Sequence, residues 1–369
     1  MSTVGDLTQG AESTAPSAER AKRVWTVTGP VEPDSLGITL VHEHLLVDGS
    51  CFFVLDEAED AEEFAGLPLS EPILGRVRAS SCSNRDNLLL DDLDVAADEL
   101  AEFVGLGGDA VVDVTSSVGL GRDPRGLRAL AERTGLRVVM GCGFYCEYSH
   151  PDAVAATSVE ELTGFIVREV TEGVDGIRAG VIGEIGVNGQ ERGTWRYLGE
   201  MTPDEEKALR AAARASLATG AALTVHQPNR ASAVPEIMRV LEEERVPPRQ
   251  VVLGHMSSVP DFDMHLEALR RGYWIAYDNF GMEHLANAWY RPITDEQRIA
   301  WLVELFRRSF GGRVLVSHDV WCKAQLRRWG GAGYGHILRT VVSRLREAGL
   351  SEADVHRLLV TNPAEVLAF

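Results

Sequence analysis

The sequence has few of the features that mark secreted, membrane-spanning or redox proteins. Its five cysteines, at positions 51, 82, 142, 146 and 322, form no regular disulfide framework, redox pair or zinc-ribbon spacing. There is no apolar run of about 18 residues, so we expect no membrane span. Residues 1–20 contain no apolar core of a signal peptide. These absences favour a cytoplasmic protein with reduced thiols.

Basic residues are also in deficit. The chain has 36 Lys and Arg against 55 Asp and Glu, which gives a formal net charge of −19. Binding to nucleic acid or to an anionic membrane surface depends on basic patches. We therefore expect neither partner, and we expect a small-molecule substrate instead.

The pattern of apolar segments predicts the fold class. We expect a flexible N-terminal tail over residues 1–23 and a single domain over 24–369, with a turn at Gly29-Pro30. Apolar segments that alternate with helical segments predict strands near residues 38, 110, 137, 180, 222, 251, 274 and 314. No glycine-rich phosphate loop follows the first of them, which argues against a doubly wound sheet. The prediction is an α/β protein with a distorted (β/α)8 TIM barrel. An insertion at about 49–90 follows the first barrel strand and could cover a site.

Polar residues stand at the ends of several of these apolar strands. His42 and His44 lie two apart in LVHEHLL, so both imidazoles should face the same side. The other strand-end residues of this kind are Glu184, His226, His255 and Asp319. A carboxylate in an apolar strand is costly unless it is paired or bound to a metal. Active sites of this barrel lie at the carboxyl ends of the strands. Four imidazoles and two carboxylates suit divalent first-row metals, and six ligands suit two ions rather than one.

Seven motifs together resemble the phosphotriesterase family of the amidohydrolase superfamily, and in particular its phosphotriesterase-related branch. They are LGITLVHEHL (36–45), GFYCEYSHP (143–151), GVIGEIG (180–186), TVHQ (224–227), LGHMS (253–257), YDNFG (277–281) and VLVSHDVWCKAQLRRWGGAGYGHI (314–337). The paired histidines together with the SHD context are the specific part. The resemblance covers nearly the whole chain from Val24 onward.

The resemblance implies a role for each of these strand-end residues. One metal would be held by His42, His44 and Asp319, and the second by His226 and His255. Glu184 stands where many members have a carboxylated lysine that bridges the two metals, and the related branch uses Glu there. The family implies zinc first, with manganese, cobalt or iron as alternatives. A homodimer is also expected by resemblance.

Asp319 and three further residues are candidates for catalysis or substrate binding. Asp319 could pass a proton from the attacking water to the leaving group. Tyr145 resembles a family tyrosine near the open metal and could position substrate. Arg230, four residues after His226, could meet a polar or anionic head, and Trp321 lies in the loop that often shapes the substrate pocket. In the insertion, Phe52 and Phe53 are candidates for apolar contacts.

The remaining histidines carry no such role. Strand alternation turns His318 away from the mouth, so we interpret it as structural. Solvated or capping positions are expected for His150, His265, His284, His336 and His356.

The bond that is hydrolysed is less constrained than the metal site. Lactone or carboxylic ester hydrolysis ranks first, and amide hydrolysis of the N-acyl amino acid type second. Phosphotriester turnover is expected as a side activity. Two alternatives stay open: a small-molecule binding protein without turnover, and a mononuclear deaminase of the same superfamily. The bridging carboxylate expected at Glu184 speaks against the deaminase.

Overall fold

The computed structural model describes residues 22–190, 197–286 and 293–369. The predicted tail lies outside these residues except for its last two positions. Arg23 already exchanges two backbone hydrogen bonds with Phe369, of 3.0 and 3.1 Å. The first described residues are thus joined to the last residue of the chain. Among the described residues, no helix has both the length and the apolar character that crossing a membrane requires.

The eight predicted barrel strands are confirmed, and they lie in two parallel sheets. One sheet has the order β3-β6-β7, and the other has the order β12-β11-β10-β9-β8. Their bounds are β3 (Thr39–Glu43), β6 (Ala110–Asp113), β7 (Arg137–Met140), β8 (Ile182–Gly186), β9 (Leu223–His226), β10 (Val251–Leu253), β11 (Trp274–Tyr277) and β12 (Val314–Val316). The structure is the predicted distorted (β/α)8 barrel, interrupted at two seams.

Backbone hydrogen bonds span both seams. The Asp319 amide donates to the His42 carbonyl at 3.1 Å, which ties the end of β12 to β3. The Gly183 amide donates to the Cys142 carbonyl at 2.6 Å, which ties β8 to the chain after β7. The first bond joins the last barrel strand to the first, and the second joins the third strand to the fourth, so the barrel is closed close to the predicted site residues.

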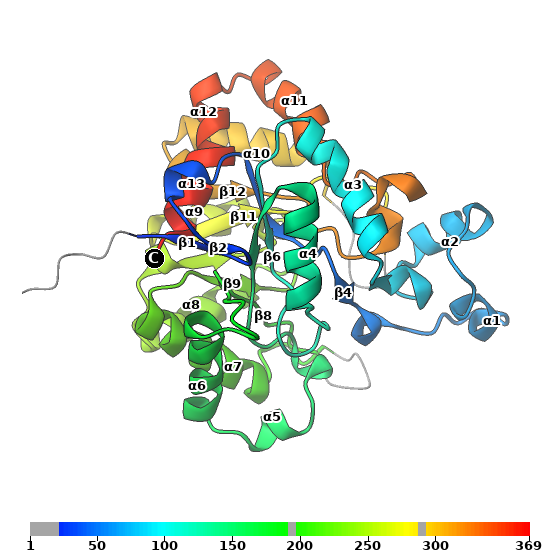
Figure 1. Cartoon of the computed structure of the whole chain (residues 1–369), viewed down its shortest axis with the longest axis horizontal. Helices are drawn as coiled ribbons and strands as arrows, with labels where there is room; N and C mark the ends of the chain where they lie inside the picture. The colour runs from blue at the N-terminus through cyan, green and yellow to red at the C-terminus, as the bar shows by residue number, and fades with distance from the viewer. Residues whose placement is uncertain (1–21, 191–196, 287–292) are drawn as a thin grey trace, which may run out of the picture.

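Helices cover the outside of the barrel (Figure 1). They include α3 (Leu93–Gly105), α4 (Pro124–Thr134), α6 (Val159–Thr171), α7 (Pro203–Thr219), α8 (Ala233–Glu243), α9 (Phe262–Arg270) and α10 (Asp295–Arg307). Local sequence fixes several ends: Ser158 and Thr202 open α6 and α7 with capping boxes. Gly135 and Gly220 end α4 and α7 in the left-handed conformation. The predicted closing helices contain α11 (Val342–Glu347), α12 (Glu352–His356) and α13 (Asn362–Leu367), with π-helical turns at Ile337–Val341 and Arg357–Thr361.

One predicted turn is wrong. Residues 24–31 form an antiparallel hairpin of β1 (Val24–Thr26) and β2 (Gly29–Val31). The chain therefore turns at residues 27–28, and Gly29 and Pro30 open the second strand. Gly29 has a φ of 123°, which other residues rarely adopt. A glycine at the first position of β2 therefore allows the chain to reverse direction there.

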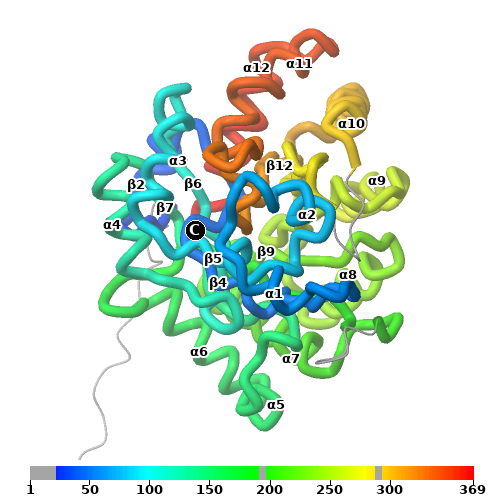
Figure 2. The backbone as a smooth tube through the Cα atoms, turned by 90° about the vertical axis from the view of Figure 1, so that its right-hand side faces the viewer, coloured from blue at the N-terminus to red at the C-terminus, as the bar shows by residue number. Residues whose placement is uncertain are grey.

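The segment 49–90 lies over one end of the barrel (Figure 2). It contains α1 (Ala61–Ala65), α2 (Leu74–Ala79) and β5 (Leu89–Leu90), which pairs with β4 (Val47–Asp48). The loop after β12 contacts this segment through two polar interactions. Lys323 pairs with Asp86 at 2.6 Å, and the Ala324 amide donates to Asn87 at 2.8 Å. The covered end is therefore the one formed by the carboxyl ends of the strands.

Candidate metal centre and cavity

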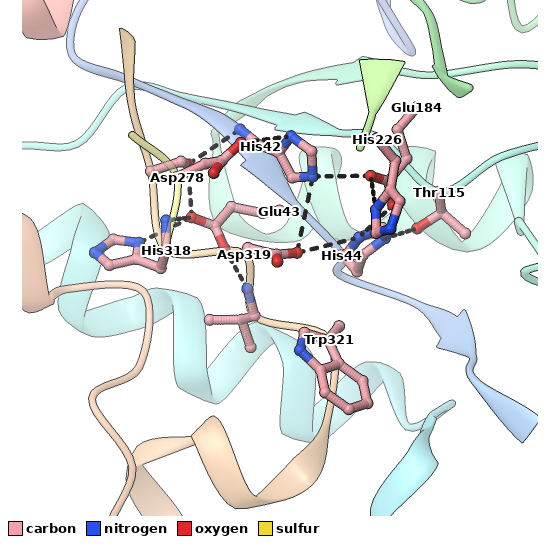
Figure 3. Close-up of polar contacts among 12 residues, drawn as sticks. His42, Glu43, His44, Thr115, Glu184, His226, Asp278, His318, Asp319 and Trp321 are labelled. Carbon is pink, nitrogen blue, oxygen red and sulfur yellow. Dashed lines mark hydrogen bonds and ion pairs between the residues drawn. The ribbon is translucent and has the colours of Figure 1, made fainter. Parts of the chain in front are cut away.

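The six predicted ligand residues converge at the carboxyl ends of β3, β8, β9, β10 and β12. Figure 3 shows His42, His44, Glu184, His226 and Asp319 of this group. Two sets of three have ligand atoms within 4.8 Å of one another. They are His42, His44 and Asp319, and His42, Glu184 and His255. The first set is the one that the family resemblance implied for one metal. The second contains His42 where the resemblance implied His226.

Glu184 lies at the centre of the group, with its two oxygens facing different histidines. Oε1 is 3.3 Å from Nε2 of His44, and Oε2 is 3.3 Å from Nε2 of His42. Oε2 also lies 3.1 Å from Nδ1 of His226 and 3.4 Å from Nε2 of His255. A carboxylate placed in this way can bridge two ions. Its backbone is buried in β8, so the strand itself brings the short side chain into reach.

Hydrogen bonds on the far side of three imidazoles fix their orientation. Asp278 accepts from the His255 amide at 3.0 Å and lies 3.1 Å from Nδ1 of the same residue. Its other oxygen is 3.3 Å from Nδ1 of His42, and Thr115 holds Nδ1 of His44 at 2.9 Å. In each case Nε2 is left facing the cluster. Partners of this kind set the tautomer and the ring angle of metal-binding histidines.

The donor set fits divalent ions. Nε2 of His42 is buried and has no hydrogen-bond partner among the described residues, although it points at the carboxylates. Burial lowers the pKa of His44, but Asp319 and Glu184 outweigh this and raise the pKa to about 10. Burial raises the pKa of Glu184, yet the imidazoles of His226 and His42 bring that pKa well below its usual range. Such mutual pairing of ligand atoms is what a metal ion would replace.

Asn279 distinguishes the two oxygens of Asp319. Oδ1 lies 3.5 Å from Nε2 of His44 and faces the ligand set. Oδ2 accepts a 3.0 Å hydrogen bond from Nδ2 of Asn279, whose own Oδ1 accepts from Ser258 at 2.6 Å. The Ser258 bond fixes which end of the amide faces Asp319. The Asp319 backbone has a φ of 57°, an uncommon conformation for a residue other than glycine.

Glu43, which lies between the two histidines of β3, holds the segment that carries Asp319. Its Oε1 accepts from the Ser317 hydroxyl, the His318 amide and His318 Nδ1, each at 2.8 Å. Its Oε2 accepts from the Val320 amide at 2.9 Å. This confirms that His318 points away from the mouth, because Nε2 on its other side accepts from the Ile337 amide. Glu43 thus fixes the backbone on both sides of Asp319.

A cavity of about 360 Å³ opens above the ligand cluster. Tyr145, Arg230 and Trp321 all line it, together with Phe52 and Asn279. The Tyr145 hydroxyl is 3.2 Å from both ring nitrogens of His226. Phe53 is not one of the described residues that line this cavity. Its ring lies under the Arg85 guanidinium instead.

Arg230 is the only Arg or Lys among the described residues that line the cavity. It follows β9, donates from Nη2 to the Asn188 carbonyl at 2.9 Å and lies over the Tyr197 ring. Burial lowers its pKa from the ordinary arginine value. A partly desolvated guanidinium in an otherwise uncharged wall provides a partner for an anion.

Two of the histidines expected in solvated or capping positions are buried instead. His265 is fully buried: Nδ1 lies 2.7 Å from the Tyr277 hydroxyl, and Nε2 lies 3.0 Å from the Val259 carbonyl. His150 is also buried and lies 2.6 Å from the Tyr145 carbonyl. His356 is exposed, as expected. Both corrections concern packing around the site and leave the ligand cluster unchanged.

Sequence reasoning missed Asp278, Asn279, Thr115 and Glu43. Asp278 and Asn279 follow the apolar strand WIAY directly, as the ligand residues follow theirs. The criterion that found the ligands, a polar residue after an apolar strand, would therefore also have selected Asp278 and Asn279. No comparable signal marks Glu43, because its partners lie 274 to 277 residues away in the sequence.

Comparison with known proteins agrees with this geometry. The model of the phosphotriesterase family matches residues 22–367. The chain belongs to the phosphotriesterase family. A relative named N-acetyltaurine hydrolase from Rattus norvegicus is 36% identical over 359 residues, which cover 94% of this chain and 98% of the relative. The chain is accordingly a hydrolase of the phosphotriesterase family, as the sequence predicted.

Two solved structures of similar proteins extend the comparison. A resiniferatoxin-binding protein from Rhodobacter sphaeroides is 37% identical, with a TM-score of 0.87 and 94% of each chain covered. The lactonase Lmo2620 from Listeria monocytogenes is 25% identical, with a TM-score of 0.74, and covers 94% of this chain and 98% of that one. The phosphotriesterase family thus includes relatives named for amide and for lactone substrates.

Proposed function

We propose that this chain hydrolyses the amide bond of a small N-acyl substrate with an anionic head, and that N-acetyltaurine is the first compound to test. This ranks amide hydrolysis above the lactone and ester hydrolysis that the sequence favoured. The observation that carries the proposal is the position of Arg230 in the same cavity as the ligand cluster. A lactone has no anionic group for Arg230 to bind, whereas the sulfonate of N-acetyltaurine has one. The name shared by the relatives supports the same choice.

The metal ligands remain part of this proposal. We assign His42, His44 and Asp319 to one ion, His226 and His255 to the other, and Glu184 to both. Zinc is the first candidate, followed by manganese, cobalt and iron, because imidazole and carboxylate ligands accept all four. Bound ions would supply Lewis-acid activation of water and of the acyl carbonyl.

Three residues of the chain then have separate roles in the reaction. Arg230 binds the anionic head and holds the amide over the cluster. Tyr145 orients the acyl oxygen through its hydroxyl, which lies beside His226. Asp319 accepts the proton of the attacking water and delivers it to the leaving nitrogen as the carbon–nitrogen bond breaks. The products are a carboxylic acid and a free amine.

A substrate panel tests the proposal. The metal-loaded protein would be followed by amine detection with N-acetyltaurine and N-acetylglycine, and by proton release with a lactone, an aryl ester and a phosphotriester. We expect the highest kcat/KM for the two anionic amides. A kcat/KM for the lactone or the ester above that for both amides would overturn the proposal in favour of the other bond class.

Two other expectations are carried forward as proposals. We propose a cytoplasmic location, which the five free cysteines support because four of them are buried as thiols. We also propose a homodimer, by resemblance to the family alone. Sedimentation of the purified chain tests the second.

A further inference from the structure

The cavity above the ligand cluster has two chemically different walls. Asn188 and Arg230 follow β8 and β9, the fourth and fifth barrel strands, and form a polar wall. Trp321 and Phe52 follow β12 and β3, the eighth and first strands, and form an aromatic wall. Strands four apart lie across a closed eight-stranded barrel from one another. The two walls therefore face each other, with the ligand cluster between them.

The two rings of the aromatic wall contact further rings, those of Tyr145 and Tyr148, which follow β7. The Phe52 ring lies 5.2 Å from the Trp321 ring and 5.6 Å from the Tyr145 ring, centroid to centroid. The Tyr148 ring lies 6.4 Å from that of Phe52 and 6.1 Å from that of Tyr145. All four contacts are edge-to-face, the arrangement that aromatic groups prefer.

These rings come from three separate parts of the chain, yet part of the wall is open to the cavity. Phe52, Tyr148 and Trp321 are only partly buried, and all four rings line the cavity. Their open surfaces are apolar area that a bound ligand would remove from water. A ring of the ligand would also extend the existing edge-to-face contacts.

The orientation of the proposed substrate decides which of its groups meets this wall. If Arg230 holds the anionic head, the amide lies over the cluster and the acyl group points to the opposite side. That side carries Phe52 and Trp321. An acetyl group offers one methyl to the rings of Phe52 and Trp321, and a cavity of about 360 Å³ falls within the range that takes drug-sized ligands.

Resting on the proposed amide hydrolysis, we infer that the acyl group this chain prefers is aromatic, of the phenylacetyl or benzoyl class, and that Phe52 and Trp321 determine this preference. N-acetyl compounds are then accepted substrates that leave the aromatic wall unused. Binding of an apolar group at this wall lowers KM more than it raises kcat if the contacts are equal in the ground and transition states.

The test is a series of N-acyltaurines that share one head group: acetyl, hexanoyl, benzoyl and phenylacetyl. We expect kcat/KM for N-phenylacetyltaurine to exceed that for N-acetyltaurine by at least about tenfold, mainly through KM. Hexanoyl separates ring recognition from bulk, and it should fall between the two. Turnover of N-acetyltaurine together with a phenylacetyl-to-acetyl ratio below one overturns this inference alone. Absence of turnover on every N-acyltaurine overturns the proposed function with it.

Variants of Phe52 and Trp321 test whether the aromatic wall causes the preference for an aromatic acyl group. Phe52→Leu and Trp321→Leu should lower the phenylacetyl-to-acetyl ratio at least about fivefold, and a thermal melt of each checks that it is folded. Phe53→Leu is the matched control, because Phe53 is the next residue and packs under Arg85 outside the cavity. Its ratio should equal that of the wild type. Equal ratios in all three variants would overturn the assignment to Phe52 and Trp321.

Discussion

Asn279 donates a 3.0 Å hydrogen bond to Oδ2 of Asp319, while Oδ1 of the same carboxylate lies 3.5 Å from Nε2 of His44. Ser258 donates to the other end of the same amide, so Asn279 is held with its NH2 group toward Asp319. Asn279 is 3% exposed and lines the cavity, which makes it a neighbour of both the carboxylate and the substrate. It acts as a positioning residue: it can orient Asp319 but cannot take a proton from it.

Asn279→Ala should lower kcat about tenfold, because one hydrogen bond to a charged group contributes about 1.5 kcal/mol. The Asp319 carboxylate would still be present, but without this hydrogen bond it would adopt other orientations. KM and the metal content should change little, and steady-state kinetics with elemental analysis measures all three. Asn279→Asp keeps the shape, removes the donor and should fall at least as far. An unchanged kcat, or loss of bound metal, would contradict the positioning role.

Glu43→Ala should destabilise the whole chain. The variant leaves the Ser317 hydroxyl, two donors of His318 and the Val320 amide without their buried partner. We expect the free energy of unfolding to fall by about 3 kcal/mol. Denaturant unfolding of Glu43→Ala and of the exposed control Glu57→Ala gives the comparison. Equal stability of the two variants would show that the buried carboxylate is not needed.

Arg230→Met should raise KM for N-acetyltaurine by about 10- to 100-fold, the effect of losing a charge-assisted hydrogen bond. The kcat should change much less, because Arg230 contacts the head and not the reacting atoms. N-acetylethanolamine, which carries no charge, separates head recognition from general damage, and its KM should stay within a few-fold. Arg270→Met on the exposed end of α9 is the control. A similar loss on the neutral substrate would remove the assigned role.

His265 should contribute to acid sensitivity. Burial lowers its pKa to about 4, against the ordinary histidine value of 6.5 expected in the unfolded chain. Below pH 6.5 the unfolded state takes up the proton first, so stability falls from pH 6.5 to about 4 and the contribution levels off below that. The full effect is about 3 kcal/mol. The slope of unfolding free energy against pH in this window should be shallower in His265→Gln and unchanged in the exposed control His356→Gln. Equal slopes in all three proteins would contradict this linkage.

The barrel and the ligand set could be predicted because both depend on local pattern. Each strand is an apolar run that is buried on both faces, as in β6 and β11. A histidine or carboxylate at the end of such a run or a few residues after it, such as His226 or Asp319, is therefore already placed at the barrel mouth. These residues can be found from the sequence without knowing which strands pair.

The rest depends on contacts that are distant in the sequence. Glu43 and His318 meet across the seam between the first and last strands, 275 residues apart, so neither predicts the other. The turn at residues 27–28 was misplaced because Gly29 and Pro30 are ordinary turn residues that here open a strand. His265 is different: it shares a helical face with buried Leu266 and Leu269, so its burial could have been read from periodicity.

The most direct measurement of the central claim is taurine release from N-acetyltaurine by the metal-loaded wild type and by Asp319→Asn, with bound metal counted in both. We expect about two ions in the wild type, release that stops on chelation, and at least about a 100-fold slower release by Asp319→Asn. Release at the wild-type rate by Asp319→Asn, or by the chelated protein, would contradict the account.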